Sequence, residues 1–245
     1  MDMPRKVKFL GRLVGLALGA AVGLLWMSSL TVYEVAVRPL DFAVGLAVTM
    51  AVGFAVGSFI DRLRWLSVTD PLTGLFNRRI FLPSVERAIV AQNPVGSQLA
   101  LVFFDIDSFK EFNDLYGHLF GDKLLCAFAK ILTDNTRSAD VVVRWGGEEF
   151  AVLLKATTDE GAQAFAERIR ETVAAIDVAK FAQVPVCHRP FTVSAGVVTL
   201  ESPVLADLGR VRDLARELTG AADAAMYRAK ARGNSVMAST LDPNE

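Results

Sequence analysis

The 245-residue chain is poor in cysteine and has almost no net charge. Its two cysteines, Cys126 and Cys187, form no Cys-x-x-Cys pair, which excludes a disulfide scaffold and a zinc knuckle. We expect both to pack as small apolar residues in a cytosolic core. Lysine and arginine number 26 against 27 aspartate and glutamate residues, a net charge of −1. This balance gives no indication of binding to a nucleic-acid polymer.

Charge is also missing from two long stretches near the N-terminus. Residues 13–33 and 42–60 contain no Asp, Glu, Lys or Arg, and each is long enough for a helix to cross a membrane. Pro39 lies in the short segment between them and interrupts any helix. The pattern predicts a membrane hairpin over residues 1–60. A cleaved signal peptide and a pair of buried core helices are the alternatives.

Basic residues are concentrated on one side of this predicted hairpin. They are Arg5, Lys6, Lys8 and Arg12 before it and Arg62 and Arg64 after it. The loop between the spans carries Arg38 against Glu34 and Asp41. The positive-inside rule then places both termini and the rest of the chain in the cytoplasm, at the bacterial inner membrane. Gly53 and Gly57 form a Gly-x-x-x-Gly pattern, which predicts a face where the hairpins of two chains pack closely.

The remaining residues have ordinary charge density and are predicted to form a helical stalk, 61–68, and one domain, 69–240. Apolar spacing predicts helices over 77–91, 122–132, 159–176 and 208–231, and strands over 99–104, 141–144, 149–154 and 191–200. The interleaved order indicates an α/β (α+β) sandwich with a mainly antiparallel central sheet. Strand 99–104 is continuously apolar, so we expect it at the centre, covered on both faces.

Two groups of acidic residues are candidates for a metal site. Asp105 and Asp107 follow the apolar strand, and Glu148 and Glu149 follow Gly146-Gly147 at a predicted hairpin turn. Hard divalent cations such as Mg²⁺ prefer carboxylate oxygens together with substrate phosphates. Asp105 is the expected ligand, whereas Asp107 either caps the helix that begins near Ser108 or helps to hold a second ion.

The chain resembles the GGDEF family, the diguanylate cyclases, in several ordered motifs. They are Asp70–Arg79, Asp105–Asn113, Tyr116–His118, Gly121-Asp122, the Gly-Gly-Glu-Glu-Phe hairpin 146–150, Val193–Gly196 and Ala225–Lys230. The resemblance spans residues 69–236. It implies a fold like that of the polymerase palm and the nucleotidyl cyclases. It also implies condensation of two GTP molecules into cyclic di-GMP and two pyrophosphates by a homodimer that binds one GTP per subunit.

The resemblance assigns roles to individual residues. Asp105, the Ile106 carbonyl group and Glu148 are the implied ligands of two Mg²⁺ (or Mn²⁺) ions per half-site. Glu148 is also the implied proton acceptor, Glu149 assists the metals, and Lys110 stabilises charge on the transferring phosphoryl group.

The resemblance also implies a set of GTP contacts. Asn113 and Asp122 would read the guanine edge, His118 would lie beside the nucleotide, and Phe109 and Lys230 would lie near the phosphates. Without the resemblance, Asn113 reads as a helix-terminal polar residue, Asp122 as a helix N-cap and His118 as structural.

One position departs from the family pattern. Asn234 stands where an arginine that aids triphosphate binding is usual, and Arg232, at a shifted position, is the candidate substitute. A neutral group binds phosphate more weakly than a guanidinium does, so we expect weaker GTP affinity.

A second site is suggested by Arg137 and Asp140, an Arg-x-x-Asp motif just before the hairpin. The resemblance implies that cyclic di-GMP binds there and inhibits the enzyme, with Arg168 in support. The alternative for the motif is a surface ion pair. Two other functions compete with the cyclase: a silent receptor for cyclic di-GMP, and a cyclase with relaxed base choice. Intact acids at positions 105, 148 and 149 favour an active enzyme.

Overall fold

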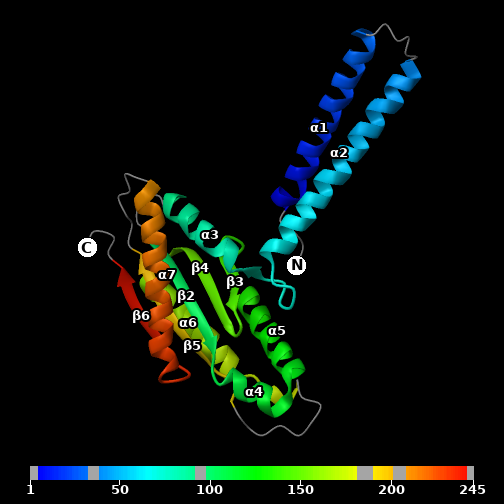
Figure 1. Cartoon of the computed structure of the whole chain (residues 1–245). Coiled ribbons are helices and arrows are strands. Elements are labelled where there is room, and N and C mark those ends of the chain that lie inside the picture. Colours follow the sequence, from blue (N-terminus) through cyan, green and yellow to red (C-terminus); the bar gives the residue numbers. More distant parts are fainter. Residues whose placement is uncertain (1–4, 33–38, 92–97, 181–189, 201–207, 242–245) are drawn as a thin grey trace. The chain divides into compact units, whose positions relative to one another are not determined.

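The chain divides between Thr69 and Asp70 into two units. The computed structural model describes residues 5–32, 39–91, 98–180, 190–200 and 208–241 (Figure 1). We describe each unit by itself.

The first unit is a pair of helices, α1 (Arg5–Val32) and α2 (Pro39–Val68), that pack against each other through glycines. A Cβ atom at Gly15 would overlap the carbonyl oxygen of Gly53, and one at Gly19 would overlap that of Thr49. Such contacts let two helix backbones approach closely. Gly53 therefore packs inside the hairpin, which corrects the prediction that it packs between chains. α2 also runs without a break through the predicted stalk.

Only one of the two predicted spans is supported by the described residues. Pro39–Leu63 of α2 is long and apolar enough to cross a membrane, whereas the apolar part of α1, Arg12–Trp26, is shorter. The predicted first span ends at residue 33, outside the described residues. Large apolar side chains of α2, including Val44, Val48 and Val52, are more than half exposed.

The second unit is built on one six-stranded sheet with the strand order β1-β3-β4-β2-β5-β6. The strands are β1 (Phe76–Asn77), β2 (Gln98–Ile106), β3 (Val141–Gly146), β4 (Glu149–Thr157), β5 (Val193–Leu200) and β6 (Val236–Leu241). The four central strands pair antiparallel, but β1 pairs parallel to β3 and β6 parallel to β5. The sheet is therefore mixed, and the prediction of a mainly antiparallel sheet is wrong at its edges. Those edge strands have no long apolar run to reveal them.

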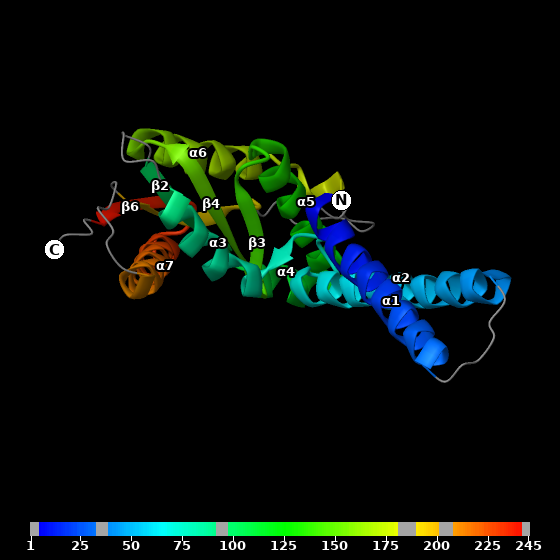
Figure 2. The ribbon, with the colours of Figure 1, turned by 90° about the horizontal axis from the view of Figure 1, so that it is seen from above.

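Helices cover both faces of this sheet (Figure 2). One layer contains α3 (Arg78–Ala91) and α7 (Leu208–Lys230), and the other contains α4 (Phe109–Tyr116), α5 (His118–Asn135) and α6 (Asp159–Ala174). Side chains of β2 alternate between the two layers: Leu101 and Phe103 face α3 and α7, whereas Val102 and Phe104 face α5 and α6. β2 is thus the doubly covered central strand that its apolar run predicts.

Two local expectations are wrong. Helix α5 begins at His118, so Asp122 lies inside the helix and is not its N-cap. Cys126 is exposed on the same helix, with its thiol 3.4 Å from the Leu72 carbonyl oxygen, and is not a core residue. Cys187 lies outside the described residues.

Candidate active site

Strand register brings the predicted carboxylates together. Asp105, near the end of β2, is directly opposite Glu149 at the start of β4. The Ile106 N–H donates to the Glu148 carbonyl oxygen at 3.4 Å, so the hairpin turn lies beside the end of β2. Side chains directly opposite in an antiparallel pair have Cβ atoms about 5 Å apart. Three acids from two segments that are distant in sequence therefore share one end of the sheet.

A lysine from α7 completes this group. The alternation along β2 directs Asp105 to the face covered by α7, and Lys230 Nζ lies 2.6 Å from Asp105 Oδ1. The approach of α7 depends on Gly196 of β5, where a Cβ atom would overlap the backbone of Met226 and Ala222. Glycine at position 196 thus lets the helix that carries Lys230 lie directly on the sheet.

Burial and crowding perturb the ionisation of these groups. Burial, with the charges of Glu148 and Glu149, raises the pKa of Asp105 to about 6, although Lys230 acts in the opposite direction. Burial raises the pKa of Glu149 too, and the charges of Asp223 and Glu148 add to this. For Lys230, burial is outweighed by the hydrogen bond and charge of Asp105, so the pKa is raised. Asp223 is a neighbour of the site that the sequence did not single out.

The oxygen-rich set fits a hard divalent cation. Asp105 is 3% exposed, and the charge on its buried Oδ1 atom is compensated by the Lys230 ammonium group, 2.6 Å away. Among the residues that the structure describes, no three His, Cys, Asp or Glu side chains converge as a complete ligand set. Asp105 and Glu148 would therefore hold the ion together with main-chain oxygen, as at Ile106, and substrate phosphates.

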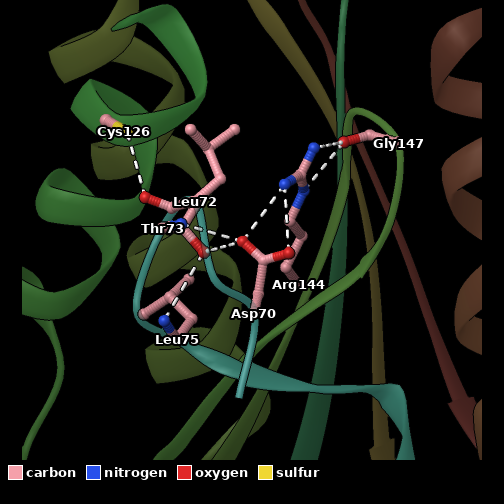
Figure 3. Close-up of polar contacts among 7 residues, drawn as sticks. All are labelled: Asp70, Leu72, Thr73, Leu75, Cys126, Arg144 and Gly147. Carbon is pink, nitrogen blue, oxygen red and sulfur yellow. Dashed lines mark hydrogen bonds and ion pairs between the residues drawn. The ribbon is translucent and has the colours of Figure 1, made fainter. Parts of the chain in front are cut away.

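A buried ion pair holds the hairpin that carries Glu148 (Figure 3). Arg144 Nη1 donates to both carboxylate oxygens of Asp70 at 3.1 Å. Arg144 Nε and Nη2 donate to the carbonyl oxygen of Gly147 at 3.0 and 2.7 Å. One guanidinium therefore joins the hairpin tip to Asp70, the first residue of the second unit. The partners are 74 positions apart in the sequence, which leaves no local pattern by which the sequence could predict this pair.

Both ends of that link are fixed by further contacts. Asp70 accepts from the N–H and hydroxyl groups of Thr73 at 2.8 and 2.7 Å. Burial alone would raise the pKa of Asp70, but the hydrogen bonds from Thr73 and Arg144 outweigh it and lower the pKa. On the hairpin, Trp145 packs edge-on against Phe81 and Phe103. The turn is thus held from the sheet face and from the start of the unit.

A buried polar atom lies where α4 meets α5. The Oδ1 atom of Asn113 is buried and has no hydrogen-bond partner. It rests on Gly121, where a Cβ atom would overlap it, and the ring of Phe109 adjoins the same glycine. His118 and Asp122 lie one turn apart on α5, the first exposed and the second partly buried. An unsatisfied buried acceptor is costly, which favours a ligand that donates to it.

Lys110 and Asp107 are two further predicted residues, and the structure gives them different surroundings. Lys110 follows Phe109 in the first turn of α4 and is exposed. Asp107 does not cap that helix. Its carboxylate accepts from Thr192 Oγ1 at 2.7 Å, Ser194 Oγ at 2.8 Å and the Asn234 N–H at 2.8 Å. Both carboxylate oxygens are thus bound to protein groups, which corrects the helix-cap prediction.

The predicted inhibitory residues gather at the far end of α5. Asp140 accepts from the backbone N–H groups of Arg137 and Lys155 at 2.9 and 3.1 Å, so it stabilises the turn. The hydrogen bonds of Asp140 therefore involve the Arg137 backbone and not its exposed guanidinium group. In a surface Arg–Asp ion pair the guanidinium group itself would contact the carboxylate. Arg168 of α6 donates from Nε to Asn135 Oδ1 at 3.3 Å, two residues before Arg137. The structure thus brings the elements carrying both arginines together.

Residues 67–235 match the profile of the family described as "Diguanylate cyclase, GGDEF domain". The chain belongs to the GGDEF family. The match confirms the resemblance seen in the motifs. Curated GGDEF relatives include the diguanylate cyclase DgcM of Escherichia coli, 39% identical over 179 residues, and the response regulator PleD of Caulobacter vibrioides, 36% identical over 182 residues. Each alignment covers 73% of this chain, but only 40% and 37% of those relatives.

Solved GGDEF structures share the fold. The coiled coil and GGDEF domain of DgcB from Caulobacter crescentus, solved with c-di-GMP, matches with a TM-score of 0.68 and 26% identity over 81% of this chain and all of that one. The active GGEEF domain of a Vibrio cholerae diguanylate cyclase matches with a TM-score of 0.53 and 28% identity, covering 66% of this chain and 96% of that one.

Proposed function

We propose that the protein is a diguanylate cyclase that condenses two GTP molecules into cyclic di-GMP with release of two pyrophosphates. The observation that carries this proposal is the intact acid set, Asp105 opposite Glu149 with Glu148 at the turn. Family membership and the named relatives support it. A silent receptor for cyclic di-GMP has no use for three acids kept together at one end of the sheet.

In the proposed reaction, the 3′-OH of one GTP attacks the α-phosphate of another. Two Mg²⁺ (or Mn²⁺) ions at Asp105, the Ile106 carbonyl and Glu148 would neutralise the triphosphate and lower the pKa of the hydroxyl group. Glu148 accepts the hydroxyl proton, and Glu149 adds negative charge beside the ions. Lys110 and Lys230 bind the phosphates, and Lys110 also stabilises charge that develops in the transition state. Because each chain holds one GTP, the reaction requires a two-fold homodimer.

Guanine selection is assigned to polar side chains of α4 and α5. The Asp122 carboxylate accepts from N1–H and N2–H₂ of guanine, and Asn113 supplies an acceptor that is buried and unsatisfied. His118 borders the nucleotide, and the ring of Phe109 lies beside Gly121, next to the Asn113 oxygen. Adenine lacks this donor edge, so it would leave the two groups unpaired, at a cost large enough for discrimination.

Three functions are separated by one assay. The full-length protein in detergent is incubated with Mg²⁺ and an equimolar mixture of GTP and ATP, and the products are resolved by chromatography. We expect cyclic di-GMP and pyrophosphate only. Mixed cyclic dinucleotides would indicate relaxed base choice, and no turnover with tight cyclic di-GMP binding would indicate a receptor.

The raised pKa of Asp105 predicts an acid limit for metal binding. Below pH 6 this carboxyl group is mostly protonated, so the affinity for Mn²⁺, measured by electron paramagnetic resonance, should fall as pH decreases through about 6. Lys230→Met removes a charge that lowers this pKa and should move the limit to higher pH. Lys130→Met, which breaks an exposed pair with Asp134, is the control. An unchanged limit in Lys230→Met contradicts the assignment.

Product inhibition is proposed at Arg137, Asp140 and Arg168, where guanidinium groups would bind the phosphates and guanines of cyclic di-GMP. Arg137→Ala should therefore keep the initial rate within about two-fold while progress curves continue to higher product levels. Asp140 holds the turn through backbone N–H groups, so this substitution leaves the turn intact. A progress curve that flattens at the wild-type product level would rule out this site.

We propose that the hairpin anchors the protein in the bacterial inner membrane, with both spans used and both termini in the cytoplasm. Exposed apolar side chains along α2 and the basic flanks support this. A C-terminal green fluorescent protein fusion should fluoresce at the membrane, and N-terminal and C-terminal alkaline phosphatase fusions should both be inactive. Activity of one phosphatase fusion alone would indicate that only α2 spans.

A further inference from the structure

The end of α7 is held by a bridge from α6 that the proposed chemistry does not use. Arg170 Nη1 donates to the side-chain oxygen of Asn234 at 3.0 Å. The Arg170 side chain is only 20% exposed, and its guanidinium is held from its own helix by Glu167 at 2.6 Å and Glu171 at 3.6 Å. The guanidinium is therefore neutralised and fixed in direction before it reaches Asn234.

The turn that contains Asn234 has an unusual backbone. Gly233 and Asn234 have φ values of +69° and +44°, both in the left-handed region, directly after α7 ends. Asparagine tolerates this region better than most residues, but it does not favour it. The Asn234 N–H donates to Asp107 Oδ2 at 2.8 Å. The turn is thus held by two hydrogen bonds, one from its backbone to Asp107 and one from Arg170 to its side chain.

The turn is connected to the active site through Asp107 and through the last turn of α7. Asp107 lies two residues after Asp105 on the same chain segment, and Lys230 lies four residues before Asn234 in the last turn of α7. Lys230 in turn pairs with Asp105 at 2.6 Å. A shift of the turn therefore moves the ammonium group relative to the carboxylate. Residue 234 is also committed to α6, so its side chain is not free to contact a triphosphate.

We propose that Arg170 is a positioning residue for GTP binding: through Asn234 it fixes the last turn of α7 and so places the Lys230 ammonium group over the phosphate site. This inference rests on the proposed function, because it assumes that GTP binds at Asp105 and Lys230. A cation that contacts the phosphates in both ground and transition states affects KM more than kcat.

The test is a double-mutant cycle on the full-length protein in detergent with Mg²⁺. Asn234→Gly retains the left-handed backbone and removes only the acceptor, Arg170→Met removes the donor, and the double variant removes both. Two quantities are measured: KM and kcat for GTP, and the Kd of 3′-deoxy-GTP, which binds but has no attacking hydroxyl. Each single variant should raise KM and Kd about five- to ten-fold, with kcat within two-fold.

The double variant should be no worse than the single ones, because residues that act through one contact are not additive. Arg170→Lys keeps a donor and should stay within two-fold of wild type. Arg216→Met, which breaks an exposed pair with Asp213 on α7, is the control for loss of a positive charge. Additive losses in the double variant, or unchanged KM and Kd in both single variants, would overturn the proposal. A wild-type protein that binds 3′-deoxy-GTP but forms no product from GTP would refute the proposed function. The Kd of 3′-deoxy-GTP for the variants would then decide the inference by itself.

Discussion

Glu148→Gln is expected to lower cyclic di-GMP synthesis at least ~1000-fold, a loss that corresponds to about 4 kcal/mol of transition-state stabilisation. An amide has nearly the size and shape of the carboxylate, but it supplies no negative charge to a cation and accepts no proton at neutral pH. Glu148 is only partly buried, at the turn between β3 and β4. We therefore expect the melting temperature to stay within about 2 °C of wild type.

The measurement is product formation by chromatography over several hours at saturating GTP and Mg²⁺. Glu217→Gln, at an exposed pair with Arg210 on α7, removes the same charge away from the site and should leave the rate unchanged. Turnover within ten-fold of wild type in Glu148→Gln would show that this carboxylate is neither ligand nor proton acceptor.

Arg144→Met is expected to have the second-largest effect, because it removes two interactions at once. It leaves the partly buried Asp70 carboxylate without its charged partner, which costs about 1–3 kcal/mol of folding stability. It also releases the Gly147 carbonyl oxygen, so the turn that carries Glu148 loses its fixed position. Misplacement by about 1 Å costs on the order of 100-fold in rate.

A double variant separates the two effects. Asp70→Asn with Arg144→Met removes both charges and keeps an oxygen that accepts from Thr73, so no unpaired charge remains at this partly buried position. We expect the double variant to recover most of the melting temperature lost in Arg144→Met while the rate stays about 100-fold low. Recovery of the rate together with stability would show that Arg144 contributes only to folding.

Local patterns in the chain predict most of the core of the second unit. The continuous apolar run at 99–104 identifies the central strand, because only a strand covered on both faces tolerates apolar side chains at every position. The two glycines at 146 and 147 identify the hairpin, because their freedom at positive φ suits a tight turn. The acids after these elements identify the chemistry, since adjoining carboxylates repel unless a cation binds them.

Properties that depend on partners distant in sequence were not predictable in this way. The edge strands β1 and β6 exist because a neighbouring strand supplies hydrogen bonds, and their own residues have no apolar pattern. Asp107 has the sequence context of a helix cap, but Thr192, Ser194 and Asn234 compete for its carboxylate and bind it. Cysteine is a residue type that is usually buried, but Cys126 is exposed because it lies on a face of α5 that does not pack into the core.

Residue types and their spacing were therefore enough to predict the family resemblance, the acid groups and the central strands, because each is carried by a motif or an apolar run only a few residues long. The tertiary structure alone decided which charges meet. Lys230 reaches Asp105 only because Gly196 admits α7, and Arg144 fixes the hairpin only because Asp70 lies beneath it. A charge–charge contact depends on distance in space, and a separation of 74 or 125 positions along the chain leaves no trace of that distance in the sequence.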